Sequence, residues 1–136
     1  MAYDDEALVQ LAIDARQNAY APYSGFTVGA ALLCADGTVF TGCNVESAAF
    51  SPTICAERTA FVKAVSEGKR TFTAIAVIGG KDATPTALCF PCGVCRQVMA
   101  EFCSADFRVL TAKDDTIVVH TLAALLPERF GPDDLR

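Results

Sequence analysis

The sequence predicts an α/β fold, in which a mixed β-sheet of five strands is flanked by helices. Apolar segments of strand and helix character alternate along the chain, and no Pro-rich or Ser-rich linker interrupts them. The first two predicted strands are joined across an Asp-Gly turn signal and the last two by a link too short for a crossover, so both pairs are expected to be antiparallel. With 136 residues, the chain has the size of one domain, and we expect residues 1–136 to form a single domain.

The first third of the chain contains the signals for a helix and a hairpin. Residues 4–18 place apolar side chains at three- and four-residue spacing, which predicts an amphipathic helix. Residues 26–33 and 38–45 predict two strands, joined by a turn at Ala35-Asp36-Gly37.

The rest of the chain alternates helices and strands. Residues 54–67 predict a helix, with Ser51 or Thr53 available as its N-cap. The strand that follows is expected to stop at Gly79-Gly80. The remaining predicted elements are strands over residues 73–78, 107–112 and 116–120, and helices over residues 92–102 and 121–126.

Composition and charge argue against several classes of partner. Eleven Lys and Arg against sixteen Asp and Glu give a net charge of -5, with no run of like charge that could grip a phosphate backbone, so nucleic acid is not an expected partner. Residues 1–14 lack the basic segment of a signal peptide, and no apolar run approaches the roughly 20 residues that span a bilayer. We therefore expect a cytoplasmic protein with no membrane partner. An apolar fraction of 52% indicates that some apolar surface is buried between subunits.

Seven cysteines stand out in the composition, and their odd number fits poorly with a closed disulfide framework. In a reducing cytosol, clustered cysteines are more often metal ligands or nucleophiles than bridges. Cys34, Cys43 and Cys103 lie at strand or helix positions and are expected to be small buried side chains. The single histidine, His120, is expected at a strand end as a surface or core residue.

Three other cysteines lie at predicted helix starts. Cys92 and Cys95 are three residues apart at the start of one helix, and Cys55 is in the first turn of the preceding helix, so three thiolates can face one zinc ion. Three ligands without an obvious fourth indicate a catalytic site, where bound water ionises near neutral pH and Glu57 can carry its proton. Because Cys55 and Glu57 are two residues apart, they can share a pocket only where the helix begins.

The motif Cys55-Ala56-Glu57, followed by Pro91-Cys92-Gly93-Val94-Cys95, resembles the signature of zinc-dependent nucleoside deaminases, with Cys in place of the first His ligand. Longer segments are similar to the small, all-cysteine cytidine deaminases, and the match runs over nearly the whole chain. These segments are PYSGFTVGAAL (22–32), GCNVES (42–47), TICAER (53–58), PCGVCRQ (91–97) and LLPERFGP (125–132). The resemblance implies a three-layer α-β-α fold with a five-stranded mixed sheet, whose last two strands are antiparallel.

The same resemblance implies an activity and a cofactor. The reaction would be hydrolytic deamination of cytidine, and of 2′-deoxycytidine, to uridine or deoxyuridine and ammonia in pyrimidine salvage. One Zn²⁺ per chain would be held by Cys55, Cys92 and Cys95. Zinc-bound hydroxide would attack C4 while Glu57 carries the proton to N3 and then to the leaving amine.

Further residues take roles through the resemblance alone. Asn44 and Glu46 would hydrogen-bond the ribose 3′-hydroxyl, Phe26 would pack against the base, and the main chain of Ala56 would meet the pyrimidine edge. Arg58 would donate to the thiolates and soften the net charge of -1 that three thiolates and Zn²⁺ carry together.

The resemblance also implies a homotetramer in which neighbouring subunits complete each site. Ala48, Phe50 and Phe130 would reach a neighbour's pocket, with Phe50 at a position where several relatives carry Tyr. The stretch before Pro91 is a few residues longer than usual, which we interpret as a loop around residues 81–86.

Alternative interpretations remain open at this point. In a non-catalytic zinc or iron–sulfur protein, Cys89 would complete a closed four-sulfur site. Another small deaminase, acting on blasticidin or on a modified cytosine nucleoside, is the alternative within the enzyme class, although Asn44-Val45-Glu46 favours an unmodified ribose. The closing hairpin argues against the tRNA-editing and polynucleotide deaminases, which place a helix between the last two strands.

Overall fold

The computed structural model describes residues 3–84 and 87–136 and contains one mixed five-stranded sheet of order β2-β1-β3-β4-β5. The strands are β1 (Thr27–Cys34), β2 (Val39–Cys43), β3 (Phe72–Gly80), β4 (Arg108–Lys113) and β5 (Thr116–Thr121). The helices are α1 (Asp5–Ala15), α2 (Ala56–Ser66), α3 (Gly93–Phe102) and α4 (Leu122–Leu125), with short 3-10 turns η1 (Arg16–Asn18) and η2 (Pro132–Leu135).

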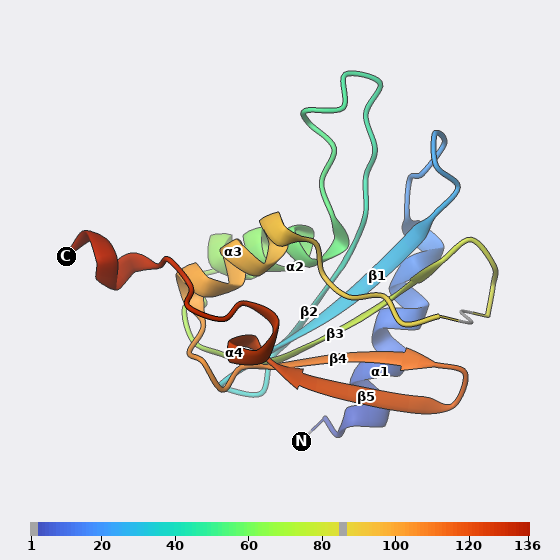
Figure 1. Cartoon of the computed structure of the whole chain (residues 1–136). Coiled ribbons are helices and arrows are strands. Elements are labelled where there is room, and N and C mark those ends of the chain that lie inside the picture. The colour runs from blue at the N-terminus through green and yellow to red at the C-terminus, as the bar shows by residue number, and fades with distance from the viewer. Residues whose placement is uncertain (1–2, 85–86) are drawn as a thin grey trace.

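Helices cover both faces of the sheet, as Figure 1 shows. Leu8, Val9 and Ala12 of α1 pack on one face in a core with small side chains of β1, β3 and β4. On the other face, Ala60 and Phe61 of α2 pack with α3 and with the remaining inward side chains of the sheet. The predicted three-layer α-β-α arrangement is therefore confirmed, and the two cores take alternate apolar side chains of the central strands.

The strand directions also agree with the prediction. The β1–β2 and β4–β5 pairs are antiparallel hairpins, and Gly37, at φ +90°, lies in the first turn. The β3–β4 pair is parallel, with α3 in the connection between its two strands. The loop that leaves the end of β3 therefore leads to the N-terminus of α3, beside the start of β1.

Two predicted boundaries are wrong for physical reasons. The first helix changes to the 3-10 turn η1 over its last predicted residues. Strand β3 does not stop at Gly79-Gly80, because both glycines pair with β1, at Val28 and Thr27. A Cβ at Gly79 would lie 2.8 Å from Val28 Cγ2 and 2.9 Å from Cys89 Sγ, so glycine here permits a close approach within the sheet rather than a turn.

The predicted loop after β3 is present over residues 81–84, while residues 85–86 of that prediction lie outside the described residues. Within the described part of the chain, the longest apolar helices fall short of what a bilayer crossing requires.

Candidate active site

Both helices that carry the candidate ligands begin at a cysteine. Cys55 is the N-cap of α2 and Cys92 the N-cap of α3, and each has an extended backbone, with ψ of 155° and 169° respectively. The prediction that Ser51 or Thr53 caps α2 is wrong, because the Thr53 hydroxyl instead accepts a hydrogen bond from the Ser47 N–H, at 3.0 Å. Neither N-cap thiol makes a capping hydrogen bond to the backbone of its own helix, so both are available to a ligand.

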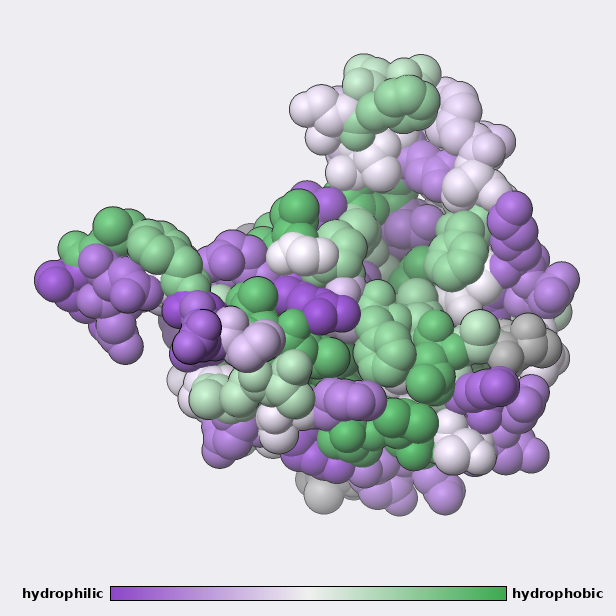
Figure 2. Space-filling view, viewed as in Figure 1, coloured by the Kyte–Doolittle hydropathy of each residue, from purple (hydrophilic) through white to green (hydrophobic). Residues whose placement is uncertain are grey.

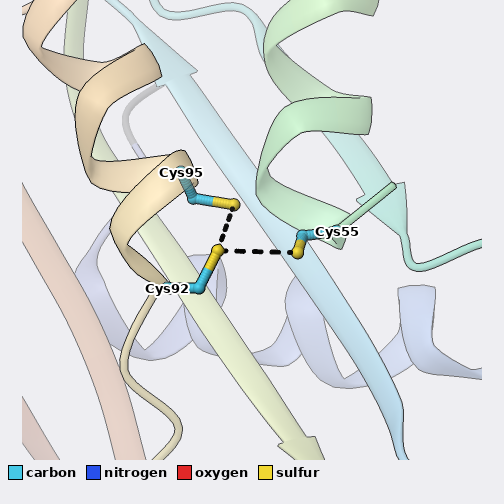
Figure 3. Close-up of side chains that lie close together, drawn as sticks. All are labelled: Cys55, Cys92 and Cys95. Atoms are coloured by element: carbon cyan, nitrogen blue, oxygen red, sulfur yellow. Dashed lines mark hydrogen bonds between the residues drawn. The ribbon is translucent and has the colours of Figure 1, made fainter. Parts of the chain in front are cut away.

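Three thiols converge between these helix starts, as Figure 3 shows. The Cys55 and Cys92 sulfurs are 3.8 Å apart, the Cys92 and Cys95 sulfurs are 3.5 Å apart, and all three lie within 4.8 Å of one another. Zn–S bonds of about 2.3 Å in a tetrahedron place sulfurs about 3.8 Å apart. The triad therefore fits one zinc ion with little rearrangement.

Cys89 does not join this triad. Among the residues that the structure describes, the group close enough to share a metal consists of Cys55, Cys92 and Cys95 alone. Structural zinc sites are closed by four protein ligands, whereas catalytic sites keep one position for water or substrate. The arrangement thus favours the open, catalytic alternative over the closed four-sulfur site.

The surroundings of the triad favour thiolates. Hydrogen bonds from the Cys95 thiol and the Arg58 guanidinium lower the pKa of Cys55 to about 5, with the Arg58 Nη2 at 3.6 Å from the Cys55 sulfur. The pKa of Cys95 is raised, because its proton is the one shared with Cys55. The positive ends of α2 and α3 point at the same place and add to this stabilisation of negative charge.

Glu57 lies next to the triad and is almost fully buried, with 4% of its surface exposed. Burial, together with the negative charge of Cys55, raises the pKa of its carboxyl group to about 7. Because Cys55 is the N-cap of α2 rather than an internal residue, both side chains reach the same cavity, as the spacing argument requires.

That cavity has a volume of about 280 Å³ and is lined by residues from four segments of the chain. It contains the predicted site residues Phe26, Asn44, Glu46 and Glu57 together with Cys55 and Cys92. Its other lining residues are Ser24, Val28, Thr53, Ile54, Cys89 and Phe90. Figure 2 shows a hollow below the raised loop that connects β2 to α2.

Of the residues that sequence reasoning missed or left undecided, Ser24 and Phe90 had a signal in the sequence. Ser24 lies in the 22–32 segment that matches the family, and Phe90 directly precedes the Pro91-Cys92 motif. Val28 and Ile54 also lie in matching segments, 22–32 and 53–58, but nothing in their residue type indicates a cavity wall, which forms only through the packing of the sheet.

Asn44 and Glu46 are held rigidly at the far end of the cavity. Asn44 accepts a hydrogen bond from the Val28 N–H and donates one to the Phe26 carbonyl, both at 2.8 Å. The Glu46 carboxylate accepts from the Ser24 hydroxyl and from the N–H groups of Tyr23 and Ser24, which lower its pKa. Each side chain keeps hydrogen-bonding capacity for a ligand.

Other predicted site residues lie outside the cavity. Ala56 is buried behind it at the start of α2, and Arg58 reaches the triad from the next turn. Ala48 and Phe50 lie on the raised loop, and Phe130 lies in the tail after α4, where both aromatic rings are exposed. Cys34 and Cys103 are buried as predicted, Cys43 is half-buried, and His120 lies on strand β5.

A three-layer α-β-α fold, a three-thiolate site with an open position and a buried carboxyl group in a cavity of small-molecule size together define a zinc-dependent hydrolytic enzyme. Comparison with known protein families narrows this class. The family described as "Cytidine and deoxycytidylate deaminase zinc-binding region" matches residues 2–111. The chain belongs to this family, whose members are hydrolases acting on C–N bonds, and its cofactor is zinc.

Individual relatives agree with this assignment. The cytidine deaminase of Sporosarcina psychrophila is 50% identical over 133 residues, which cover 97% of this chain and 95% of the relative. The cytidine deaminase of Halalkalibacterium halodurans is 48% identical over 134 residues, with coverage of 97% and 98%. The crystal structure of cytidine deaminase from Burkholderia pseudomallei is 44% identical, with a TM-score of 0.87 and coverage of 94% of this chain and 100% of that one.

Proposed function

We propose that this protein is a cytidine deaminase that converts cytidine and 2′-deoxycytidine to uridine and deoxyuridine, with release of ammonia, in pyrimidine salvage. The observation that supports the proposal is a single cavity with candidate metal ligands at one end and polar side chains that can bind hydroxyl groups at the other. Its inner end holds Cys55, Cys92 and Glu57, and its outer end holds Asn44 and Glu46. A nucleoside has the matching polarity, with a reactive amidine at one end and hydroxyl groups at the other.

The chain's own residues would divide the chemistry as follows. Cys55, Cys92 and Cys95 would hold the zinc ion, which would supply the Lewis acidity that lets a water molecule lose its proton near neutral pH. The Glu57 carboxylate accepts that proton, delivers it to N3 of the pyrimidine and later transfers a proton to the amino group on C4. Protonation of N3 makes C4 more electrophilic, so the hydroxide left from the water would add to C4. The remaining hydroxyl proton would pass through Glu57 to the amine, and the C4–N bond would break, so water and cytidine give uridine, protonated at N3, and ammonia.

Substrate orientation would come from the outer end and the walls. Asn44, which is held by Val28 of β1, and Glu46, which is held by Tyr23 in the turn before β1, bind the ribose 3′-hydroxyl. Phe26 packs against the base, and the main chain of Ala56 meets the pyrimidine edge. Arg58 donates to the Cys55 sulfur and reduces the negative charge of the zinc site, which favours ionisation of water there.

The family also contains deaminases of deoxycytidylate, and the charges of the cavity favour the nucleoside over this nucleotide. Among the described residues that line it there is no Lys or Arg, while Glu46 places a carboxylate at the sugar end. A phosphate group would meet negative charge without a cationic partner. This is the reason to prefer cytidine as the substrate.

We further propose that the protein is a cytoplasmic homotetramer, without a nucleic acid or membrane partner, in which residues 1–136 form one domain. The raised loop between β2 and α2 supports this assembly, because Phe50 at its tip is 71% exposed, and Phe130 in the tail is 58% exposed. Apolar side chains of this size are costly to leave in water and suit contact with a neighbouring subunit. Ala48, Phe50 and Phe130 would then close a neighbour's cavity.

The test is the loss of cytidine absorbance on deamination, measured with a panel of substrates. We expect turnover of cytidine and 2′-deoxycytidine, and far lower kcat/KM for free cytosine, which lacks the sugar that Asn44 and Glu46 bind. Equal values for cytosine and cytidine would show that the sugar assignment is wrong. A preference for deoxycytidylate over cytidine would favour the nucleotide alternative.

A further inference from the structure

One wall of the cavity has no role in the reaction described above. It is formed by Cys89 and Phe90, in the segment between β3 and α3. The Cys89 N–H donates to the Thr111 hydroxyl at 3.0 Å, and Thr111 is fully buried on β4. This bond fixes the backbone of the wall to the sheet.

The Cys89 thiol is packed tightly against neighbours that also line the cavity. A Cβ built on Gly79 would lie 2.9 Å from the Cys89 sulfur and 3.0 Å from Phe26 Cε1, so the thiol and the Phe26 ring both crowd the space above this glycine. Burial raises the pKa of Cys89 to about 11, so the thiol presents a neutral, weakly polar surface.

Phe90 continues this wall toward the mouth of the cavity. Its ring is 40% exposed and lies edge-on against the ring of His120, with centroids 5.2 Å apart. Pro91 follows it and restricts its backbone, and the ligand Cys92 comes next. The ring is therefore attached at a fixed place relative to the zinc site.

The chemistry of this wall selects one edge of a cytosine ring. N3, O2 and the amino group all form hydrogen bonds, and burying them against Cys89 and Phe90 would leave them without strong partners. The edge formed by C5–H and C6–H has no such group. The C5–C6 edge also lies opposite N3 on the ring. In the proposed reaction N3 faces Glu57 on α2, whereas Cys89 and Phe90 belong to the segment that leads into α3, so these two residues face the C5–C6 edge.

We propose that Cys89 and Phe90 pack against the C5 edge of the pyrimidine and determine which 5-substituents the enzyme accepts. This inference rests on the proposed cytidine deamination. Because Cys89 is pinned between the sheet and Phe26, a group added at C5 must displace the Phe90 ring. Phe90 is thus the specificity-determining residue for 5-substituted cytosine nucleosides.

The experiment compares 5-methylcytidine with cytidine as the ratio of their kcat/KM values. A single methyl group in an apolar pocket changes such ratios roughly 10- to 200-fold. We expect Phe90→Ala to raise the ratio about tenfold or more, and Phe90→Leu, which keeps part of the wall, to raise it less. Val62→Ala, which truncates an exposed apolar side chain on the outer surface of α2, is the matched control and should leave the ratio unchanged.

A second readout does not depend on turnover. Calorimetric dissociation constants for the products 5-methyluridine and uridine should show the same change in ratio for Phe90→Ala. Cytidine turnover with an unchanged ratio in both Phe90 variants would overturn the wall assignment and leave the proposed function standing. A wild-type protein that deaminates neither nucleoside while holding zinc would overturn both.

Discussion

The two ends of the cavity are built in different ways. The metal end is built within one chain, with Cys95 1% exposed and Glu57 4% exposed at the starts of two helices that pack on the sheet, while Cys92 at the N-cap of α3 is exposed. The outer end is open, and beyond it the raised loop and the tail carry aromatic rings that are largely exposed, such as Phe50 at 71%. The candidate ligands and Glu57 are therefore positioned by the fold of a single chain, whereas the outer end of the cavity is closed only if a neighbouring subunit covers it, as proposed above.

The difference reflects what each end has to do. A zinc site needs ligands within a few tenths of an ångström of their final places, and helix N-termini anchored in a core provide that rigidity. A rim has to admit and release a nucleoside, and a loop can do so if a neighbouring subunit supports it. Mutations at the metal end should accordingly change zinc content and kcat, whereas mutations at the outer end should mainly change KM.

The largest effect is expected at the metal end. Cys95→Ala removes a buried zinc ligand, so we expect loss of bound zinc, loss of cytidine turnover and a lower melting temperature, because metal binding stabilises the folded state. Zinc content and thermal unfolding measure these changes. Cys103→Ala is the matched control, since Cys103 is equally internal but lies outside the triad, and it should keep zinc and lose about 1 kcal/mol of stability.

Glu57→Gln separates proton transfer from metal binding. The amide keeps the size of the side chain but cannot carry a proton, so kcat should fall roughly 10²- to 10⁴-fold while zinc content is unchanged. Steady-state kinetics with metal analysis provides the measurement. Glu101→Gln, at an exposed carboxylate on α3, should behave as wild type, and a Glu57→Gln enzyme with wild-type kcat would refute the proton-carrier role.

Substitutions at the outer end should affect binding more than chemistry. Glu46→Gln replaces a carboxylate that bonds the Tyr23 and Ser24 backbone, which weakens both the loop and the contact with the ribose. We expect KM for cytidine to rise roughly tenfold or more with a smaller change in kcat. Free cytosine serves as the internal control, because its low rate should hardly change, and an equal loss for both substrates would contradict a sugar contact.

The smallest effect per site is expected at the rim. Phe50→Ala removes an exposed ring that meets Tyr23 edge-on at 6.4 Å and would extend toward a neighbour. We expect weaker self-association and a KM that rises on dilution, measured by sedimentation and by kinetics over a range of protein concentrations. An unchanged tetramer with unchanged KM would mean that this loop serves no neighbouring site, and Val62→Ala provides the exposed apolar control.

Much of this picture follows from local sequence patterns. The Asp-Gly turn signal at residues 36–37 and the short link at residues 113–115 placed β1 and the last hairpin within one or two residues of their observed bounds. Likewise, cysteines three apart at a helix start can only point to one side, so the triad could be predicted from spacing and helix position.

Other features depend on contacts between distant segments and have no local signal. The N-cap of α2 is Cys55 rather than the predicted Ser51 or Thr53, because residues 45 and 54 form a β-bridge that holds Thr53 in the loop. Arg16 is buried and pairs with no carboxylate among the described residues, and its guanidinium donates to the carbonyls of Thr27, Gly80 and Asp82, at 3.0, 3.0 and 2.7 Å. Only the assembled sheet brings those carbonyls together, and the same is true of the wall formed by Cys89 and Phe90.

The most direct test of the account is cytidine turnover by the wild-type protein before and after removal of its metal. Uridine formation is followed by absorbance, and bound zinc is measured on the same samples. The account predicts one zinc per chain, loss of turnover on chelation and recovery in proportion to the zinc restored. Undiminished turnover by protein shown to be free of metal would contradict it.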